Sequence, residues 1–224
     1  FSRQSIVSLR PRELSNPFGL PQALLATGYR YSSTATANNS LTHLPYQLNY
    51  DRLTDSEVEI FEFPVTIEDE ALPKMGDRLP QALEVAKRIS RYGGSVVVLI
   101  HPNVLDHKLA FEKGFVEGVR TYAWFGSVGE FGRWWAARNR VEVDVVRDAA
   151  AMRVTLNVPV SLAGLTLEVP PGWEVARSGN PLRGVAQHGT MVTFPQLQGT
   201  YTVLFTPSSL TPSALARRHR VRTQ

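Results

Sequence analysis

The hydrophobic and polar positions divide the chain into two regions with different patterns. Up to about residue 148, apolar strand-like runs alternate with amphipathic helix-like runs, as in βα units around a parallel sheet or barrel. Beyond that point the apolar runs are short, alternate with polar residues and are separated by proline and glycine. We therefore predict an α/β portion over residues 1–148, a small β-sandwich domain over 149–208 and a basic tail over 209–224.

Periodicity and breaker residues locate the elements of the α/β portion. Strands are expected at residues 5–9, 59–63 and 95–100, and helices at 22–26, 77–92, 107–119 and from 127 onward. Residues 95–100 are uncharged and mostly β-branched or aliphatic, which predicts the most buried strand of the chain. Asp77 is expected to cap the helix that follows it, and Ser127 with Glu130 matches a capping box.

The later part of the chain is predicted to be all β. Strands are expected at residues 141–145, 152–158, 165–169, 191–194 and 201–205, most of them with period-two alternation. Trp173 follows a Pro-Pro-Gly turn and is expected to be a core aromatic residue.

Composition and charge narrow the functional classes. The chain is 43% hydrophobic and 20% charged, which is ordinary for a globular protein, and no apolar run approaches the roughly 20 residues of a membrane helix. Cysteine is absent, which excludes disulfides, thiolate catalysis and zinc–cysteine sites. The net charge of +4 equals the four arginines among the last eight residues, so the remainder is near neutral. This tail is either a solvated terminus or a contact for an anionic polymer.

Several motifs of other classes are missing. There is no glycine-rich phosphate loop, no G-x-S-x-G elbow and no H-E-x-x-H pair. The long polar stretch 32–57 contains tyrosines but few basic residues, so we predict no nucleic-acid partner. The chain begins at Phe1 without a signal-type apolar segment, which leads us to expect a fragment or a processed chain.

His101 is the leading candidate for chemistry. It directly follows the 95–100 strand, and Pro102 stops that strand at once. In α/β folds, reacting groups gather at the carboxyl ends of parallel strands, and imidazole titrates near neutral pH and suits acid–base work. The alternative is a core or capping histidine whose nitrogens are satisfied by backbone groups.

Two charged residues are candidates to support His101. Arg10 soon follows the first strand and could orient a carboxylate by bidentate hydrogen bonding, or it could be a surface arginine. Within Glu68-Asp69-Glu70, Asp69 is the residue that could hydrogen-bond to His101 and orient it, although such a run commonly forms a solvated turn. Trp124 could contribute to a sugar-stacking surface, with core packing as the alternative.

Four short segments together resemble the later motifs of the polysaccharide deacetylases, carbohydrate esterase family 4. In chain order they are Ser8-Leu-Arg-Pro-Arg-Glu-Leu-Ser15, Ala26-Thr-Gly-Tyr-Arg-Tyr-Ser-Ser33, Phe61-Glu-Phe-Pro-Val-Thr66 and Val98-Leu-Ile-His-Pro102. The resemblance covers about the first 100 residues. It implies a partial, deformed (β/α) barrel and the removal of acetyl groups from cell-envelope or extracellular glycans.

The resemblance also implies roles for individual residues. His101 is similar to the histidine that protonates the leaving amine or alcohol, Arg10 to the arginine that orients the catalytic aspartate, and Asp69 to the acid that tunes the histidine. Tyr31 and Trp124 are predicted to contact the polysaccharide. No residue of this chain is predicted to bind a metal.

The chain departs from the family in its metal motifs. The family's Asp-Asp and His-x-x-x-His motifs do not occur here, and Ser32 stands where many relatives carry aspartate. A divalent metal such as zinc is expected only together with those N-terminal motifs. We therefore expect an extracytoplasmic deacetylase portion that works with the missing N-terminal segment or with other envelope proteins. Two alternatives stay open: a non-catalytic carbohydrate-binding or envelope component, and an α/β protein of another function.

Overall fold

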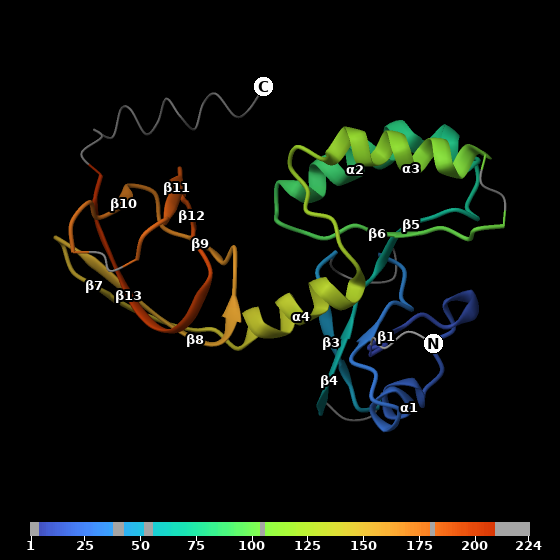
Figure 1. The fold of residues 1–224 in the computed structure, drawn as a ribbon, viewed down its shortest axis with the longest axis horizontal. Helices are drawn as coiled ribbons and strands as arrows, with labels where there is room; N and C mark the ends of the chain where they lie inside the picture. The colour runs from blue at the N-terminus through green and yellow to red at the C-terminus, as the bar shows by residue number, and fades with distance from the viewer. Residues whose placement is uncertain (1–4, 38–42, 52–55, 104–105, 180–181, 209–224) are drawn as a thin grey trace. The chain divides into compact units, whose positions relative to one another are not determined.

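The computed structural model describes residues 5–37, 43–51, 56–103, 106–179 and 182–208. The fold is mixed α/β, with helices and strands in several sheets, and the described residues form no closed barrel (Figure 1). The chain divides into two compact units between Gly132 and Arg133. The predicted basic tail 209–224 lies outside the described residues.

Among its described residues, the first unit contains two groups of strands, three helices, the start of a fourth helix and short 3-10 turns. The strands are β1 (Ser8–Leu9), β2 (Tyr31–Ser32), β3 (Tyr46–Asn49), β4 (Glu57–Glu62), β5 (Val65–Glu68) and β6 (Val97–Leu99). The helices are α1 (Leu20–Ala26), α2 (Leu79–Ser90), α3 (Asp106–Val119) and α4 (Val128–Asn139), with 3-10 turns at Arg12–Leu14 and Met75–Arg78. Helix α4 begins in this unit and ends in the next.

Strands β1, β2 and β4 are parallel neighbours, so their carboxyl ends lie on the same side of the sheet. Leu9 is in register with Ser32, and Ser32 with Glu62. Strand β3 closes one edge of this sheet by antiparallel pairing with β4. Helix α1 covers one face, where its apolar side chains form a buried cluster with those of β4.

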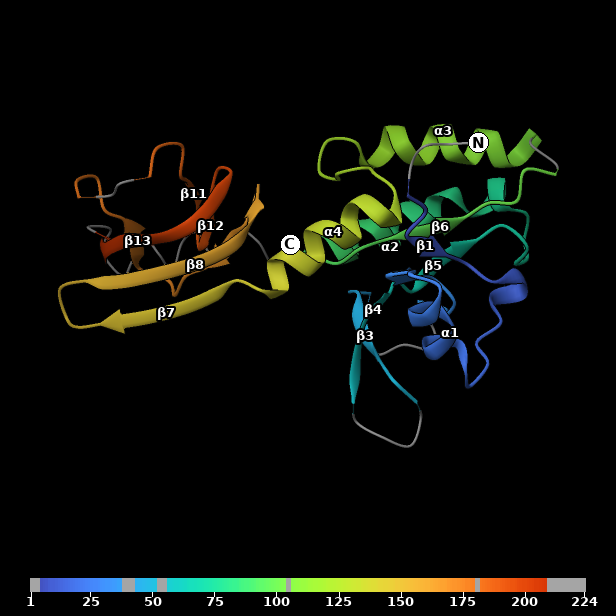
Figure 2. The same cartoon turned by 60° about the horizontal axis from the view of Figure 1, so that its bottom comes forward.

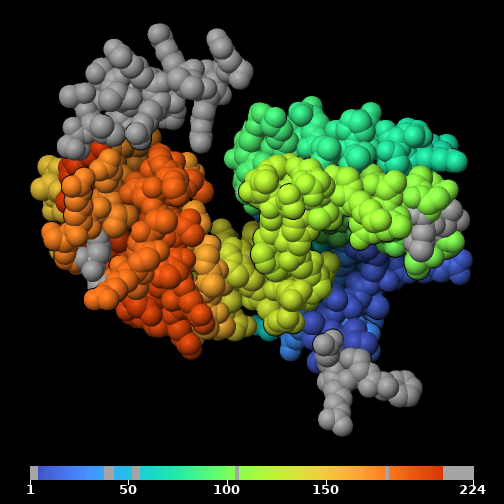
Figure 3. Space-filling view, turned by 45° about the horizontal axis from the view of Figure 1, so that its top comes forward, coloured from blue at the N-terminus to red at the C-terminus, as the bar shows by residue number. Residues whose placement is uncertain are grey.

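Strands β5 and β6 form a parallel pair covered by α2 and α3. Glu68 is in register with Leu99, so the chain leaves both strands at the same edge. Side chains of α2 and α3 pack with those of both strands in one apolar cluster. The two helices lie side by side (Figure 3). Gly114 and Gly118 of α3 permit this approach, because a Cβ atom at either position would lie about 2.5 Å from a leucine of α2.

The second unit is built from two antiparallel sheets. One has the order β10-β13-β8-β7 and the other β11-β12-β9. The strands are β7 (Glu142–Arg147), β8 (Met152–Leu162), β9 (Thr166–Glu168), β10 (Trp173–Val175), β11 (Ala186–His188), β12 (Met191–Thr193) and β13 (Leu197–Pro207). Both sheets contribute to one buried apolar cluster, which includes Trp173 as the sequence predicted.

Two local predictions need correction. The predicted domain boundary at residue 148 stays a prediction; in the structure β7 pairs with β8, and the compact units divide between Gly132 and Arg133. Asp77 does not cap α2: it lies in the preceding 3-10 turn, and the cap position is Arg78 without a side-chain cap. Strand β6 is only half-buried, since it has a described partner on one side only. The Ser127–Glu130 capping box is present, with Ser127 N donating to Glu130 and Glu130 N donating to Ser127.

Candidate functional site

His101 lies at the carboxyl edge of the β5–β6 pair. Strand β6 ends at Leu99, and Ile100 still packs against the apolar cluster under α2 and α3. The His101 side chain, in contrast, is 44% exposed. The ring therefore lies at the rim of the sheet, which is inconsistent with the alternative of a core histidine.

Asp69 holds His101 by two hydrogen bonds. It follows β5 directly, and its side chain is fully buried. The backbone N–H of His101 donates to Asp69 Oδ2 at 2.8 Å, and His101 Nδ1 lies 2.9 Å from Asp69 Oδ1. The hydrogen bond expected from the sequence is thus present, and parallel register is its cause, because it brings the ends of β5 and β6 together.

Lys108 is the third member of this cluster, and the sequence reasoning missed it. Its ammonium group lies 2.5 Å from Asp69 Oδ2 and donates to the His101 carbonyl at 3.0 Å and to Asn103 Oδ1 at 2.8 Å. The Lys108 side chain is only 8% exposed. A signal for it exists: Lys108 stands on the buried face of α3 with Phe111 and Phe115, at helical spacing where an apolar residue is expected.

The surroundings of Asp69 fix its protonation state. Burial alone would raise the pKa of Asp69, but the hydrogen bonds from Lys108 and His101 lower that pKa well below its ordinary value. Asp69 is therefore a carboxylate at neutral pH and can only accept hydrogen bonds. Consequently Nδ1 of His101 carries a proton, and Nε2 is the nitrogen left to exchange one. Within the described residues, Nε2 has no hydrogen-bond partner.

The two glutamates beside Asp69 differ in their relation to His101. Glu70 Oε1 is 3.7 Å from His101 Nδ1, but its side chain is 73% exposed, so water screens this interaction. Glu68 takes part through its backbone, whose carbonyl accepts a hydrogen bond from Arg78. Only Asp69 of this acidic run is therefore built into the cluster.

Arg10 belongs to a different cluster, at the carboxyl ends of β1, β2 and β4. Its Nε donates to the Ser33 carbonyl at 3.1 Å and its terminal nitrogen to Ser33 Oγ at 2.8 Å, while Ser33 Oγ donates to the Phe63 carbonyl at 2.8 Å. Burial lowers the pKa of Arg10, and the charge of Glu62 opposes that shift. In the described part of the chain, no hydrogen bond or ion pair joins Arg10 to His101. Its orienting role stays a prediction.

Glu62 is a buried carboxylate that the sequence reasoning also missed. Its Oε1 accepts hydrogen bonds from the backbone N–H groups of Thr34 at 2.5 Å and Ala35 at 2.8 Å, and its Oε2 lies 3.2 Å from Thr34 Oγ1. Glu62 thus fixes the segment that follows β2. Nearby Ser32, also fully buried, has a hydroxyl without a hydrogen-bond partner among the described residues.

The two predicted substrate contacts differ in accessibility. Tyr31 is 6% exposed, packs edge-on against Phe63 and lies against Gly132, so little of its ring can reach a ligand. Trp124 is 66% exposed and contacts Phe131 with a centroid separation of 6.2 Å. Its ring is available for stacking on a sugar. Contact of either residue with a polysaccharide stays a prediction.

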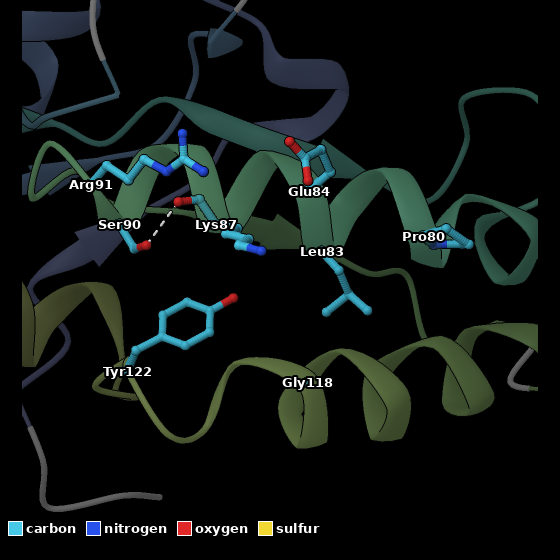
Figure 4. A pocket seen from close by; sticks show the side chains of 8 residues that line it. All are labelled: Pro80, Leu83, Glu84, Lys87, Ser90, Arg91, Gly118 and Tyr122. Carbon is cyan, nitrogen blue, oxygen red and sulfur yellow. Dashed lines mark hydrogen bonds between the residues drawn. The ribbon is translucent and has the colours of Figure 1, made fainter. Parts of the chain in front are cut away.

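A surface groove of about 570 Å³ lies between α2 and α3 (Figure 4). Leu83, Lys87 and Tyr122 are among the side chains around it, and it contains none of the predicted site residues. Across the described ranges, no group of three or more His, Asp or Glu side chains could hold a metal ion. No described helix has the length and apolarity needed to cross a membrane.

Comparisons with protein-family models, with curated proteins and with solved structures found no match to this chain. The fold and the site define the chain as a mixed α/β protein with an aspartate–histidine pair where two parallel strands end.

Proposed function

We propose that this chain is part of an extracytoplasmic polysaccharide deacetylase in which His101 is the general acid. The observation that carries the proposal is the pairing of an exposed imidazole with a buried, ionised Asp69. The four family-like segments of the sequence support the choice of substrate class. In this proposal, the first unit is a portion of a deformed (β/α) barrel and the second is a β-sandwich.

The pair suits the proton transfer that deacetylation needs. When the acetyl C–N or C–O bond breaks, the departing sugar amine or alcohol must gain a proton. Protonated His101 can give that proton from Nε2, while Nδ1 keeps its hydrogen bond to Asp69. Because Lys108 neutralises Asp69 from the buried side, the carboxylate is held in one position and the ring keeps one orientation.

The described residues do not fit a catalytic metal. They contain no ligand cluster, and the sequence has no Asp-Asp or His-x-x-x-His motif. We therefore derive no step through a metal from this chain. In the family, the divalent metal supplies the activated water; here any such group would have to come from residues outside this sequence.

The test compares two substrates on the full-length protein and its His101→Gln variant. Acetate release is measured from an acetylated glycan, whose leaving group needs a proton, and from an activated aryl acetate, whose phenolate departs without one. We expect His101→Gln to lower glycan deacetylation about 100-fold or more and to change aryl acetate hydrolysis little. His188→Gln, at an exposed position in β11, is the matched control.

Two outcomes would contradict the proposal. Equal loss with both substrates would remove the general-acid role from His101. Glycan binding without acetate release from any acetylated glycan, in a folded protein, would instead favour a non-catalytic carbohydrate-binding component.

A further inference from the structure

Strand β7 of the second unit is the longest edge strand among the described sheets. Its six residues are all exposed, and it pairs with β8 without a register shift at the rim of the sheet (Figure 2). It contains no proline, lysine or β-bulge, the features by which edge strands ordinarily avoid further pairing. The other described edge strands have two to four residues. Strand β7 therefore presents a regular row of backbone groups that another strand can join.

The hairpin between β7 and β8 determines which backbone groups of β7 face outward. The backbone N–H of Asp148 donates to the Ala151 carbonyl at 2.9 Å, so residue 148 directs its backbone groups toward β8. Pairing continues in register along β7, and this direction alternates from residue to residue in an antiparallel ladder. Val143, Val145 and Arg147 therefore direct their N–H and C=O groups away from β8.

The side chains of β7 alternate between the two faces of its sheet. One face borders a groove of about 280 Å³ and carries Val143, Val145 and Arg147. The other face carries Glu142, Asp144 and Val146. A strand that completes this edge has to avoid placing an acidic residue opposite the acids of the second face, because like charges directly opposite destabilise a sheet.

A second copy of β7 meets this condition in one register. Antiparallel neighbours keep the same faces on the same side, so a symmetric pair places one residue opposite itself. Within residues 142–147, only the registers centred on Asp144 and on Val145 pair five residues. The first places two Asp144 carboxylates opposite one another. The second places Val145 opposite Val145, Asp144 opposite Val146 and Val143 opposite Arg147, and it joins the outward backbone groups of each copy.

Two acidic residues still meet at each end of this register. Glu142 lies opposite Asp148 of the other copy, just beyond the paired residues. Each carboxylate is already bound within its own copy: Glu142 Oε2 accepts from Asn157 Nδ2 at 2.9 Å, and Asp148 Oδ1 accepts from the backbone N–H groups of Ala150 and Ala151 at 2.7 and 2.8 Å. Water screens the repulsion at these exposed ends.

We propose that the chain forms a two-fold symmetric dimer in which β7 pairs antiparallel with β7 of a second copy about Val145. The four-stranded sheets of the two copies then form one continuous sheet. The pairing covers Val145 and Val146, which are 52% and 56% exposed in the single chain. The aliphatic part of each Arg147 lies along Val143 of the other copy. This dimer does not depend on the proposed deacetylase activity.

A single-cysteine experiment tests the register, because the chain has no cysteine of its own. Val145→Cys places the new thiol opposite its own copy. Val143→Cys is the matched control, because Val143 lies on the same face and is 48% exposed, but its copy is roughly 13 Å away in this register, beyond the reach of a disulfide.

Each full-chain variant is incubated with oxidised glutathione, which accepts the two electrons lost as two thiols join, and products are separated on a gel without reductant. We expect the disulfide-linked dimer to form roughly tenfold faster with Val145→Cys than with Val143→Cys. Equal rates, or a faster reaction of Val143→Cys, would overturn the proposal.

Sedimentation equilibrium of the full chain measures the association without cysteines. We expect a monomer–dimer equilibrium with a Kd of about 10 µM, because one strand pair is a small interface. Val145→Lys places two ammonium groups opposite one another and should weaken the dimer roughly tenfold. Val160→Lys, at a 40% exposed valine of β8, is the control and should leave the dimer unchanged. A chain that stays monomeric at about 100 µM, or equal weakening by both substitutions, would also overturn the proposal.

Discussion

Two buried carboxylates of the first unit, Glu62 and Asp69, stand at the carboxyl ends of parallel strands but do different things. Glu62 ends β4 and accepts hydrogen bonds from the backbone of Thr34 and Ala35. Asp69 follows β5 and holds Lys108 and His101. Both side chains are buried and well partnered, so burial and hydrogen bonding do not distinguish them.

The two carboxylates differ in their hydrogen-bond partners and in whether a partner is exposed to solvent. The partners of Glu62 are backbone N–H groups and one hydroxyl, none of which changes its protonation near neutral pH. One partner of Asp69 is an imidazole that is 44% exposed and can exchange a proton with a ligand. A buried acid at a strand end indicates a reactive site when it orients a titratable group at the surface. Otherwise it indicates a residue that stabilises the fold.

The largest expected effect comes from breaking the Asp69–Lys108 pair. Asp69→Ala leaves the Lys108 ammonium buried without its carboxylate, so we expect a loss of about 4 kcal/mol in the free energy of unfolding. Urea denaturation measures it, with Glu70→Ala as the control at an exposed neighbouring position. Replacing both partners, Asp69→Asn with Lys108→Met, is expected to cost less than Asp69→Ala alone. A single-variant loss under 1 kcal/mol would contradict the buried pair.

Glu62→Ala should be the next most damaging change. It removes the acceptor of two backbone N–H groups in a fully buried place, and we expect a loss of about 3 kcal/mol. Glu59→Ala on the same strand is the control, because the Glu59 side chain is 66% exposed. A second readout is activity: Glu62→Gln should leave any His101-dependent activity at the level expected from the stability of the variant alone.

Much of the Asp69 cluster could be predicted from the sequence. The sequence placed His101 and Asp69 each directly after a strand-like run. The parallel register of β5 and β6 brings these two strand ends together. Lys108 could have been found as a charge at an apolar helical position. The Glu62 cluster could not, because its partners include the backbone N–H groups of Thr34 and Ala35, which no residue type identifies, and a carboxylate in an apolar strand run has no local signature.

The same limit applies to the fold. A strand at 141–145 was predicted, but alternation does not reveal which strand it joins, and in the structure this segment pairs with β8. Strands β10 and β11 have three residues each, too few for a recognisable period, and they exist through pairing with β13 and β12. The local pattern of apolar and polar residues predicts that a strand forms. Tertiary contacts decide which other strands it pairs with.

A pH series separates Asp69 from ordinary surface acids. The pKa of Asp69 is lowered in the folded protein, whereas the unfolded chain has an ordinary value near 4. Its contribution to stability is therefore complete above about pH 5 and is lost as the pH falls toward the lowered folded value. We expect Asp69→Asn to be less stable than the unmodified protein at pH 7 and to lose less stability on acidification. Parallel stability curves from pH 7 to 3 would contradict this assignment.

His101→Ala is expected to have the smallest effect on stability, and it tests directly whether His101 has a different role from the partners of Glu62. The imidazole is nearly half exposed, and the backbone N–H of residue 101 still bonds Asp69 after the substitution, as does Lys108. We expect a loss of about 1 kcal/mol, the usual value for one hydrogen bond, measured by urea denaturation. A loss near that of Asp69→Ala would place His101 among the architectural residues with Glu62. A small loss in stability, together with loss of the acetate release proposed above, would indicate that the cluster stabilises the strand ends through Asp69 and Lys108 and reacts through His101.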